Sequence, residues 1–319
     1  MDNILDQIKA FGVVPIAVID NEEKAVPLAN ILLENGMPII EVTLRTDSAL
    51  RSIEKIAKEC PKILLGAGTV LNVEDAQKAI DYGAKFIVSP GFNPKIVEYC
   101  NYKSVVVLPG VLTPTEIQNA VESGVKVLKL FPMESIGGLA YLKAVSAPFR
   151  DVKFIPTGGV NNNNLLLYLK HPKVLACAGS WIIPSDKIAN GQFGEIADLV
   201  RQAIATILGF NIYHIGINST SAEDARIIVN QLQKIFPFEN IEKENSIFIG
   251  SQVEVMKRAY LGQHGHIAIA TNFIDRAIAY LANRGIGIKP ETKNEENGKL
   301  RTVYLDVEIG GFAVHLIQI

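Results

Sequence analysis

The chain of 319 residues has few cysteines, little net charge and no long hydrophobic run. Cys60, Cys100 and Cys177 are widely spaced and form no metal-binding or redox motif, which favours a reducing cytoplasm. The net charge of −2 argues against a nucleic-acid-binding or membrane-surface protein. No apolar stretch approaches the ~18 residues of a transmembrane helix. The N-terminal segment lacks the basic start and apolar run of a signal peptide. We therefore expect a cytoplasmic globular protein, with no nucleic acid and no membrane among its partners.

Short β-branched runs recur about every twenty residues in the first part of the chain, and helical patterns separate them. The runs are 13–19, 39–45, 64–70, 86–90, 105–110, 127–132, 154–159 and 174–182. Eight strands that alternate with helices predict an α/β fold, a (β/α)8 TIM barrel, over residues 1–207. A doubly wound sheet is the competing topology, but no G-x-G-x-x-G motif follows the first run.

After Gly209 the pattern changes. A strand-like segment at 212–218 is followed by a helical pattern and further short strands, and a similar order restarts at 265. This twofold repeat of roughly fifty residues predicts a smaller α+β domain of paired βαβββ modules over residues 211–319. The polar stretch 289–299 is predicted to be a loop within it.

Lys129 is enclosed by apolar neighbours in the run 127–132. Burial of a lysine disfavours the ammonium, and a desolvated amine is the nucleophile that a Schiff-base enzyme needs. A structural lysine that snorkels or pairs with Glu41 is the alternative interpretation. Other lysines near the predicted strands stand at or before the first strand residue, where water reaches them: Lys85, Lys126, Lys153 and Lys173.

Polar residues gather at the C-terminal ends of the predicted strands, which form the active-site face of a barrel. They are Glu41, Arg45, Thr69, Ser89, Lys129, Thr157 and Ser180. Glu41, Thr43 and Arg45 share one side of their strand because side chains alternate. The glycines at 158–159 and the small residues at 178–180 would let the backbone approach a phosphate.

Six segments resemble the class I 2-keto-3-deoxy-6-phosphogluconate and 4-hydroxy-2-oxoglutarate aldolases. They are EVTLRT (41–46), GAGTV (66–70), SPG (89–91), KLFPME (129–134), PTGGV (156–160) and AGSWI (178–182). The resemblance covers residues 1–207. It implies a homotrimer that needs no cofactor, in which Lys129 forms the Schiff base and Glu41 is the general acid and base. It also implies a set of substrate-binding residues: Arg45 and Thr69 for the pyruvyl carboxylate, Pro90 and Phe131 beside it, and Gly158, Gly159 and Ser180 for the distal phosphate.

Histidines are concentrated in the last third of the chain. His214 and His266 lie on the first predicted strand of each half, and Glu254 and His315 on the last. Imidazole and carboxylate ligands suit Zn²⁺, Ni²⁺, Fe²⁺ or Mn²⁺, although each histidine could instead be an ordinary hydrogen-bonded strand residue.

Residues 211–319 resemble the glyoxalase / vicinal-oxygen-chelate superfamily through the segments YHIGIN, VEVM, GHIAIAT and FAVHLIQ. The resemblance implies a divalent metal held by His214, Glu254, His266 and His315. Glyoxalases normally have glutamate at the last position, so His315 argues against glyoxalase activity. A dioxygenase, a metal-sensing regulatory module and an inert oligomerisation domain all remain open.

The predicted function is cleavage of a small keto acid substrate by a class I aldolase. The substrate would be 2-keto-3-deoxy-6-phosphogluconate, 4-hydroxy-2-oxoglutarate or both. One alternative is a barrel isomerase or synthase that acts on a phosphorylated metabolite, uses the loop 157–159 and does not need Lys129. The other is a metabolite-binding protein in which the C-terminal domain carries the function.

Overall fold

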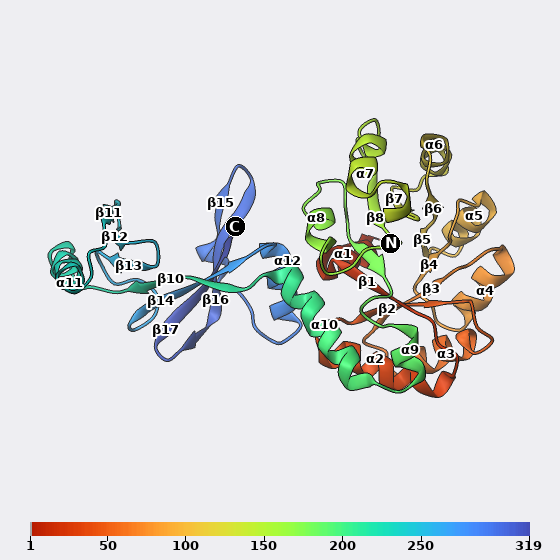
Figure 1. Ribbon diagram of the computed structural model, residues 1–319, viewed down its shortest axis with the longest axis horizontal. Coiled ribbons are helices and arrows are strands. Elements are labelled where there is room, and N and C mark those ends of the chain that lie inside the picture. Colours follow the sequence, from red (N-terminus) through yellow and green to blue (C-terminus); the bar gives the residue numbers. More distant parts are fainter. Residues whose placement is uncertain (1) are drawn as a thin grey trace. The chain divides into compact units, whose positions relative to one another are not determined.

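The computed structural model describes residues 2–319 and divides into two compact units, Met1–Ile207 and Leu208–Ile319 (Figure 1). Among the described residues, no helix has both the length and the apolar character to cross a membrane. Cys60, Cys100 and Cys177 are all buried, and no disulfide joins them.

The first unit contains a curled parallel sheet. Its strands are β1 Val13–Ala17, β2 Ile39–Thr43, β3 Leu64–Gly68, β4 Phe86–Val88, β5 Val106–Leu108, β6 Gly110–Val111, β7 Val127–Leu130, β8 Lys153–Pro156 and β9 Cys177–Gly179. They pair in the orders β5-β4-β3-β2-β1-β9 and β6-β7-β8. Pro109 separates β5 from β6 and accepts a hydrogen bond from the Lys129 N–H at 3.0 Å, and an isolated parallel bridge joins Thr157 to Ala178.

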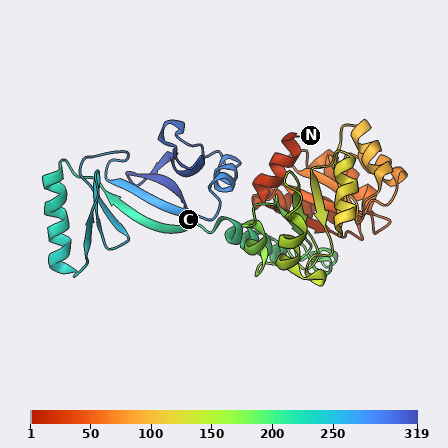
Figure 2. The ribbon, with the colours of Figure 1, turned by 90° about the horizontal axis from the view of Figure 1, so that it is seen from above.

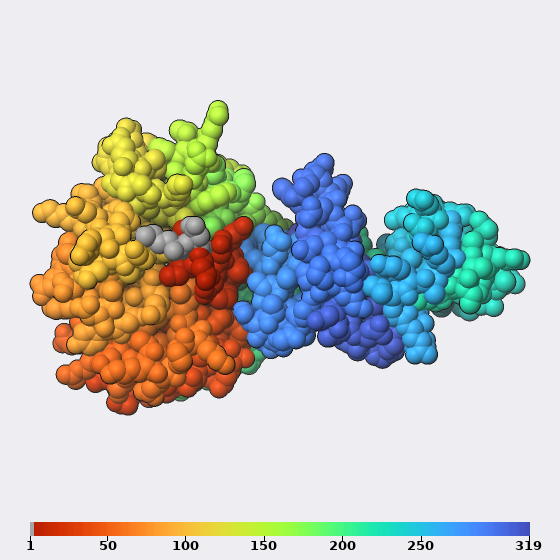
Figure 3. Space-filling view, turned by 180° about the vertical axis from the view of Figure 1, so that it is seen from behind, coloured from red at the N-terminus to blue at the C-terminus, as the bar shows by residue number. Residues whose placement is uncertain are grey.

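Helices surround these strands (Figure 1). They are α1 Asp2–Phe11, α2 Ala25–Glu34, α3 Ala49–Glu59, α4 Val73–Asp81, α5 Pro94–Tyr102, α6 Pro114–Glu122, α7 Gly138–Ser146, α8 Leu165–Leu169, α9 Ser185–Ala189 and α10 Phe193–Leu208, with short 3₁₀ turns η1 Glu22–Lys24 and η2 Glu134–Ile136. Several of these helices begin at N-capping residues: Thr113 and Glu116 form a capping box at α6, and Asn72 caps α4. Figure 3 shows the outer surface of this unit, coloured from red to green, from the side opposite to Figure 1. Because helices cover the strands, β1, β2 and β3 are buried along their whole length and are mostly apolar.

The second unit is built on a mixed sheet whose halves repeat the same order of elements. The first half has β10 Asn211–Ile217, α11 Ala222–Ile235, β11 Asn240–Glu242, β12 Ser246–Ile249 and β13 Val253–Met256. The second half has β14 Gly265–Thr271, α12 Ile274–Ala282, η3 Pro290–Thr292, β15 Asn294–Glu296, β16 Lys299–Ile309 and β17 Phe312–Gln318. The sheet order is β11-β12-β13-β10-β14-β17-β16-β15.

The two halves of this sheet are related by matching strand pairs. In each half the first and last strands pair in parallel, β10 with β13 and β14 with β17. The halves meet where β10 and β14 pair antiparallel, and these long strands run side by side in Figures 1 and 2. The four central strands are therefore the first and last strands of both halves.

The prediction of a loop over 289–299 is wrong. These residues form η3, β15 and the turn that leads into β16, and Glu296 pairs with Lys299 across that turn. Asn297 and Gly298 both have positive φ, 53° and 71°, as the two central residues of a tight hairpin turn require. The Asn-Gly pair is typical of such a hairpin turn, but the polar residues around it favoured the prediction of a loop.

Candidate active site and candidate metal centre

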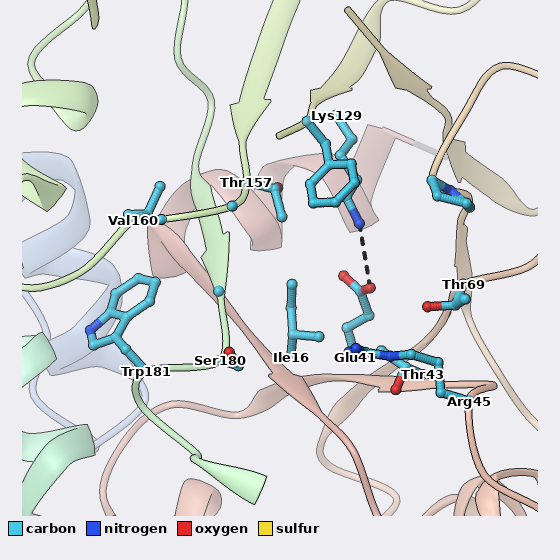
Figure 4. A pocket seen from close by; sticks show the side chains of 15 residues that line it. Ile16, Glu41, Thr43, Arg45, Thr69, Lys129, Thr157, Val160, Ser180 and Trp181 are labelled. Carbon is cyan, nitrogen blue, oxygen red and sulfur yellow. Dashed lines mark ion pairs between the residues drawn. The ribbon is translucent and has the colours of Figure 1, made fainter. Parts of the chain in front are cut away.

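The side chains of Lys129 on β7 and Glu41 on β2 point toward each other inside the first unit (Figure 4). Lys129 Nζ lies 3.9 Å from Glu41 Oε1, and the two side chains are 10% and 2% exposed. This separation is an ion pair but is longer than a hydrogen bond. The Phe131 ring lies beside the amine, with its centroid 5.4 Å from Nζ. An enclosed amine and a carboxyl thus stand together with no direct hydrogen bond between them.

Burial controls the protonation of Glu41. Desolvation raises the pKa of this carboxyl, and the charges of Lys129 and Arg45 oppose the rise without cancelling it. Glu41 Oε1 is buried and has no hydrogen-bond partner within residues 2–319. A buried carboxylate oxygen that accepts no hydrogen bond is costly, which favours the protonated carboxyl. Glu41 can therefore hold a proton at a pH where an exposed glutamate cannot.

Gly68 on β3 provides the space for the Glu41 carboxyl. A Cβ on Gly68 would lie 2.0 Å from Glu41 Oε1 and 2.7 Å from its carboxyl carbon. Any larger residue would therefore displace the carboxyl. Gly68 belongs to the GAGTV motif, but the sequence does not reveal this role because the contact joins two neighbouring strands.

A cavity of about 510 Å³ opens above this pair. Every residue predicted for the aldolase site lines it: Lys129, Glu41, Arg45, Thr69, Pro90, Phe131, Gly158, Gly159 and Ser180. Ser89 does not line it, since its hydroxyl donates to the Gly91 carbonyl at 2.7 Å. Three further residues line the cavity that the sequence did not single out: Ile16, Val160 and Trp181.

The pocket has two ends, with Lys129 and Glu41 between them (Figure 4). Arg45 and Thr69 lie at one end, and Val160, Ser180 and Trp181 lie at the other. Such an arrangement suits a substrate with an anionic group at each end and a reactive carbon in the middle.

Thr69 has an unusual backbone conformation. Its φ is 58°, in the left-handed region that a β-branched residue rarely adopts. Strained residues of this kind persist only where the surrounding structure holds them, and they cluster at functional sites. Thr69 follows β3 directly and lines the pocket, so the strain occurs in the pocket wall.

The loop after β8 presents backbone N–H groups in succession. The carbonyls of Thr157 and Gly158 accept hydrogen bonds from the N–H groups of Met133 and Glu134 at 2.8 and 3.0 Å. In a trans peptide the C=O and N–H point in opposite directions, so the N–H groups of Gly158 and Gly159 point away from these donors. Both glycines have positive φ, 93° and 86°.

Two asparagines continue this arrangement. The side chains of Asn161 and Asn164 donate to the Gly159 carbonyl at 3.1 and 3.2 Å, which orients the N–H of Val160 in the same way. Successive N–H groups in a glycine-rich turn form a concave anion-binding nest. Gly158, Gly159 and Val160 all line the pocket.

Trp181 borders the same end of the pocket. Its ring packs on Gly179, where a Cβ would lie 2.3 Å from the ring, and its indole N–H donates to Asn162 Oδ1 at 3.3 Å. Sequence reasoning missed it because an aromatic residue after a strand is ordinarily a packing residue.

In the second unit, the four predicted ligands converge on the central strands. His214 Nε2 and His266 Nε2 are 3.0 Å apart, and they lie 3.1 and 3.2 Å from Glu254 Oε2. His315 joins them, since the nearest ring nitrogens of the three histidines all lie within 4.8 Å of one another. Atoms that share one ion at about 2.1 Å lie about 3.0 to 3.4 Å apart, so the spacing of the His214, His266 and Glu254 atoms fits a common metal.

The protonation states also suit metal binding. Burial and the nearby His266 and His214 lower the pKa of His315 to about 3, which leaves a neutral imidazole. Desolvation works against ionisation of Glu254, but hydrogen bonds with His214, His266 and Ser246 hold its pKa well below the usual range. The Nδ1 atoms of the three histidines are buried, and within residues 2–319 no group hydrogen-bonds to them. The cluster therefore contains unsatisfied donors and acceptors.

Comparison with known proteins concerns the first unit. The profile of the family described as "Aldolase: KDPG and KHG aldolase" matches residues 4–199. A curated relative from Treponema pallidum, named 2-dehydro-3-deoxy-phosphogluconate aldolase, is 44% identical over 207 residues. The match covers 65% of this chain and 99% of the relative.

Two solved structures are similar to the first unit. The KDPG aldolase of Legionella pneumophila, with pyruvate captured as a covalent carbinolamine, is 35% identical with a TM-score of 0.61, covering 63% of this chain and 97% of that one. The 2-keto-3-deoxy-6-phosphogluconate aldolase of Zymomonas mobilis, solved with 3-phosphoglycerate, is 36% identical with a TM-score of 0.60, covering 65% and 97%. This chain belongs to the KDPG and KHG aldolase family.

Proposed function

We propose that the first unit is a class I aldolase that cleaves 2-keto-3-deoxy-6-phosphogluconate to pyruvate and glyceraldehyde 3-phosphate. Cleavage of 4-hydroxy-2-oxoglutarate to pyruvate and glyoxylate would use the same residues. The observation that carries the proposal is the enclosed pair of Lys129 and Glu41, 3.9 Å apart, in the pocket of a chain from this family.

The reaction begins at Lys129. Its amine attacks the C2 carbonyl of the substrate in the unprotonated form. The hydroxyl of the resulting carbinolamine takes a proton from the Glu41 carboxyl and leaves as water, which gives an iminium ion and the Glu41 carboxylate. The iminium accepts the electron pair of the C3–C4 bond as that bond breaks. The aldehyde leaves, and an enamine of pyruvate remains on Lys129.

Glu41 moves the protons. Its carboxylate takes the proton of the C4 hydroxyl during cleavage and returns it to C3 of the enamine. Water then hydrolyses the imine and frees pyruvate and Lys129. The raised pKa of Glu41 supports this role, because the carboxyl must hold the proton between the two steps.

The ends of the pocket hold the two anionic groups of the substrate. Arg45 and Thr69 would bind the pyruvyl carboxylate, with Pro90 and Phe131 beside it. The nest of Gly158, Gly159 and Val160, with Ser180, would bind the distal phosphate. A second carboxylate could occupy the same donors.

Trapping the Schiff base tests the proposal. Borohydride with pyruvate should label the wild-type chain at Lys129, and Lys129→Ala should lose both the label and essentially all pyruvate release. Lys126→Ala is the matched control, since Lys126 is exposed just before the same strand. Activity should persist in excess EDTA. A fully active Lys129→Ala protein would reject the Schiff-base mechanism. A wild-type chain that releases no pyruvate would instead favour the isomerase or synthase.

The architecture proposed for this unit is a closed (β/α)8 barrel. The support is that β5 and β6 continue one another across Pro109 and that the bridge between Thr157 and Ala178 links β8 to β9. We also propose a homotrimer, which light scattering of the purified protein would test.

For the second unit we propose a glyoxalase-like domain with a divalent metal held by His214, Glu254, His266 and His315. Its paired βαβββ order and the 3.0 to 3.2 Å spacing of three ligand atoms support this assignment. A metal bound there would supply Lewis-acid chemistry. The chain's own residues orient it, because the ligands come from the four central strands.

Metal analysis of the full-length protein tests this centre. We expect about one ion per chain, lost in His214→Ala and retained in His264→Ala, whose histidine is exposed and outside the cluster. Less than ~0.2 ion per chain after expression in metal-rich medium would favour an inert domain instead.

A further inference from the structure

The metal centre proposed above lies in a second cavity of about 670 Å³. His214, Glu254, His266 and His315 all line this cavity. A volume of this order suits a small organic molecule, since ligand pockets commonly span about 300 to 1,000 Å³. The cavity is larger than the ion and its four ligands need.

Apolar and aromatic side chains form much of the wall. Phe248 packs edge-on against His214, with ring centroids 5.5 Å apart, and Tyr304 lies 4.8 Å from His315 between centroids. Ile241 and Met256 also line the cavity. A ligand with an apolar or aromatic body would therefore find contact area beside the ligand histidines.

Among the described residues, the wall carries one cationic side chain that no carboxylate neutralises. Among the lining residues, Lys243 is the one lysine or arginine and Glu254 is the one carboxylate. Within residues 2–319, no carboxylate forms an ion pair with Lys243, whereas the neighbouring Lys257 pairs with Glu242 at 2.9 Å. The Lys243 charge is thus available to a ligand.

Lys243 is also held in place. Its N–H donates to the Ser246 carbonyl at 2.8 Å, and its own carbonyl accepts from Lys257 Nζ at 2.6 Å. Its ammonium lies 4.2 Å from the Phe248 ring centroid, a cation–π contact. The ammonium is therefore positioned beside an aromatic surface of the same cavity.

We propose that this cavity binds a small organic carboxylate with an aromatic or apolar body. Lys243 recognises the carboxylate, and Phe248 and Tyr304 pack against the body. The inference rests on the metal centre, because a divalent ion with three neutral imidazoles and one carboxylate leaves a net charge of +1, which adds to that of Lys243.

The test uses the full chain loaded with Co²⁺, whose visible spectrum reports events at the metal centre and not at the aldolase pocket. Cobalt content is measured first. The probes are benzoate and phenylacetate, which cannot form a Schiff base, and their neutral amides. We expect both acids to shift the spectrum at saturable concentrations and to bind at least tenfold more tightly than the amides.

Lys243→Met should weaken binding of the acids about tenfold and leave the amides unchanged. Lys234→Met, at an exposed lysine of α11 outside the cavity, is the matched control. Equal affinities in Lys243→Met and wild type, or no spectral shift with either acid on a cobalt-loaded chain, would overturn the proposal while leaving the metal centre standing. A chain that takes up no cobalt would reject both.

Discussion

Gly68→Ala provides a sharp test of how Glu41 is positioned. The added Cβ would lie 2.0 Å from Glu41 Oε1, whereas ordinary contact begins at 3.4 Å. The carboxyl must therefore retreat by roughly 1.4 Å, the difference between these distances. The three nearest atoms to the added Cβ are Oε1, the carboxyl carbon and Cγ of Glu41, at 2.0, 2.7 and 2.8 Å. All three belong to one flexible side chain, so that side chain can turn and the strand need not move.

The expected magnitudes separate catalysis from stability. Displacing a reacting group by about 1 Å can cost on the order of 10²-fold in rate. An off-rotamer side chain costs about 0.5 to 1.5 kcal/mol, and replacing a strand glycine by alanine returns about 0.5 to 1 kcal/mol. We therefore expect kcat to fall about 10²-fold while the free energy of unfolding changes by no more than about 1 kcal/mol.

The assay is steady-state pyruvate release, combined with urea unfolding and borohydride trapping. Labelling of Lys129 by pyruvate should persist after long incubation, because the amine itself is not displaced. Gly91→Ala is the control, since no atom outside its immediate neighbours lies within 4 Å of a Cβ there. A folded Gly68→Ala protein with wild-type kcat would refute the placement of Glu41 as the proton carrier.

Two further predictions concern the distal nest and the buried carboxyl. Asn164→Ala removes one donor to the Gly159 carbonyl, so KM for the phosphorylated substrate should rise about tenfold with kcat little changed. Pyruvate, which lacks the distal anion, should still label Lys129 normally; an unchanged KM would remove Asn164 from this role. Glu41→Gln should lose about 10²-fold or more in kcat. The folded wild type holds the Glu41 proton above pH 4.5, the ordinary pKa of the group, whereas the unfolded chain loses it. Wild-type stability therefore falls as pH rises from 4.5 through the raised pKa, and Glu41→Gln, which does not titrate, should gain stability relative to wild type over that range. Urea midpoints from pH 4 to 8 measure this, and a difference independent of pH would contradict it.

The sequence alone was enough to predict a pair of Lys129 and Glu41, because both signals are local. A lysine enclosed by apolar residues is visible in one run, and the common side of Glu41 and Arg45 follows from strand alternation. The two-unit organisation was also legible, since the alternating α/β pattern gives way to a repeat after Gly209. Both features can be recognised from the periodicity and composition of short segments, because neither depends on contacts between distant residues.

Other features depend on contacts between distant segments. The space that Gly68 leaves for Glu41, and the pinning of the Gly159 carbonyl by Asn161 and Asn164, exist only once strands and loops pack. The hairpin at 294–299 required a partner strand before its polar residues could pair.

The histidine cluster shows the same division. The sequence alone placed His214 and His266 at matching positions of a repeat, and the prediction of a shared site depended on that symmetry. The antiparallel junction of β10 and β14 brings the two ring nitrogens to 3.0 Å, although 52 residues separate them in the chain. The sequence shows which side chains a strand carries and which of them share one side of it. The distance between strands from separate halves is set by the sheet that joins them.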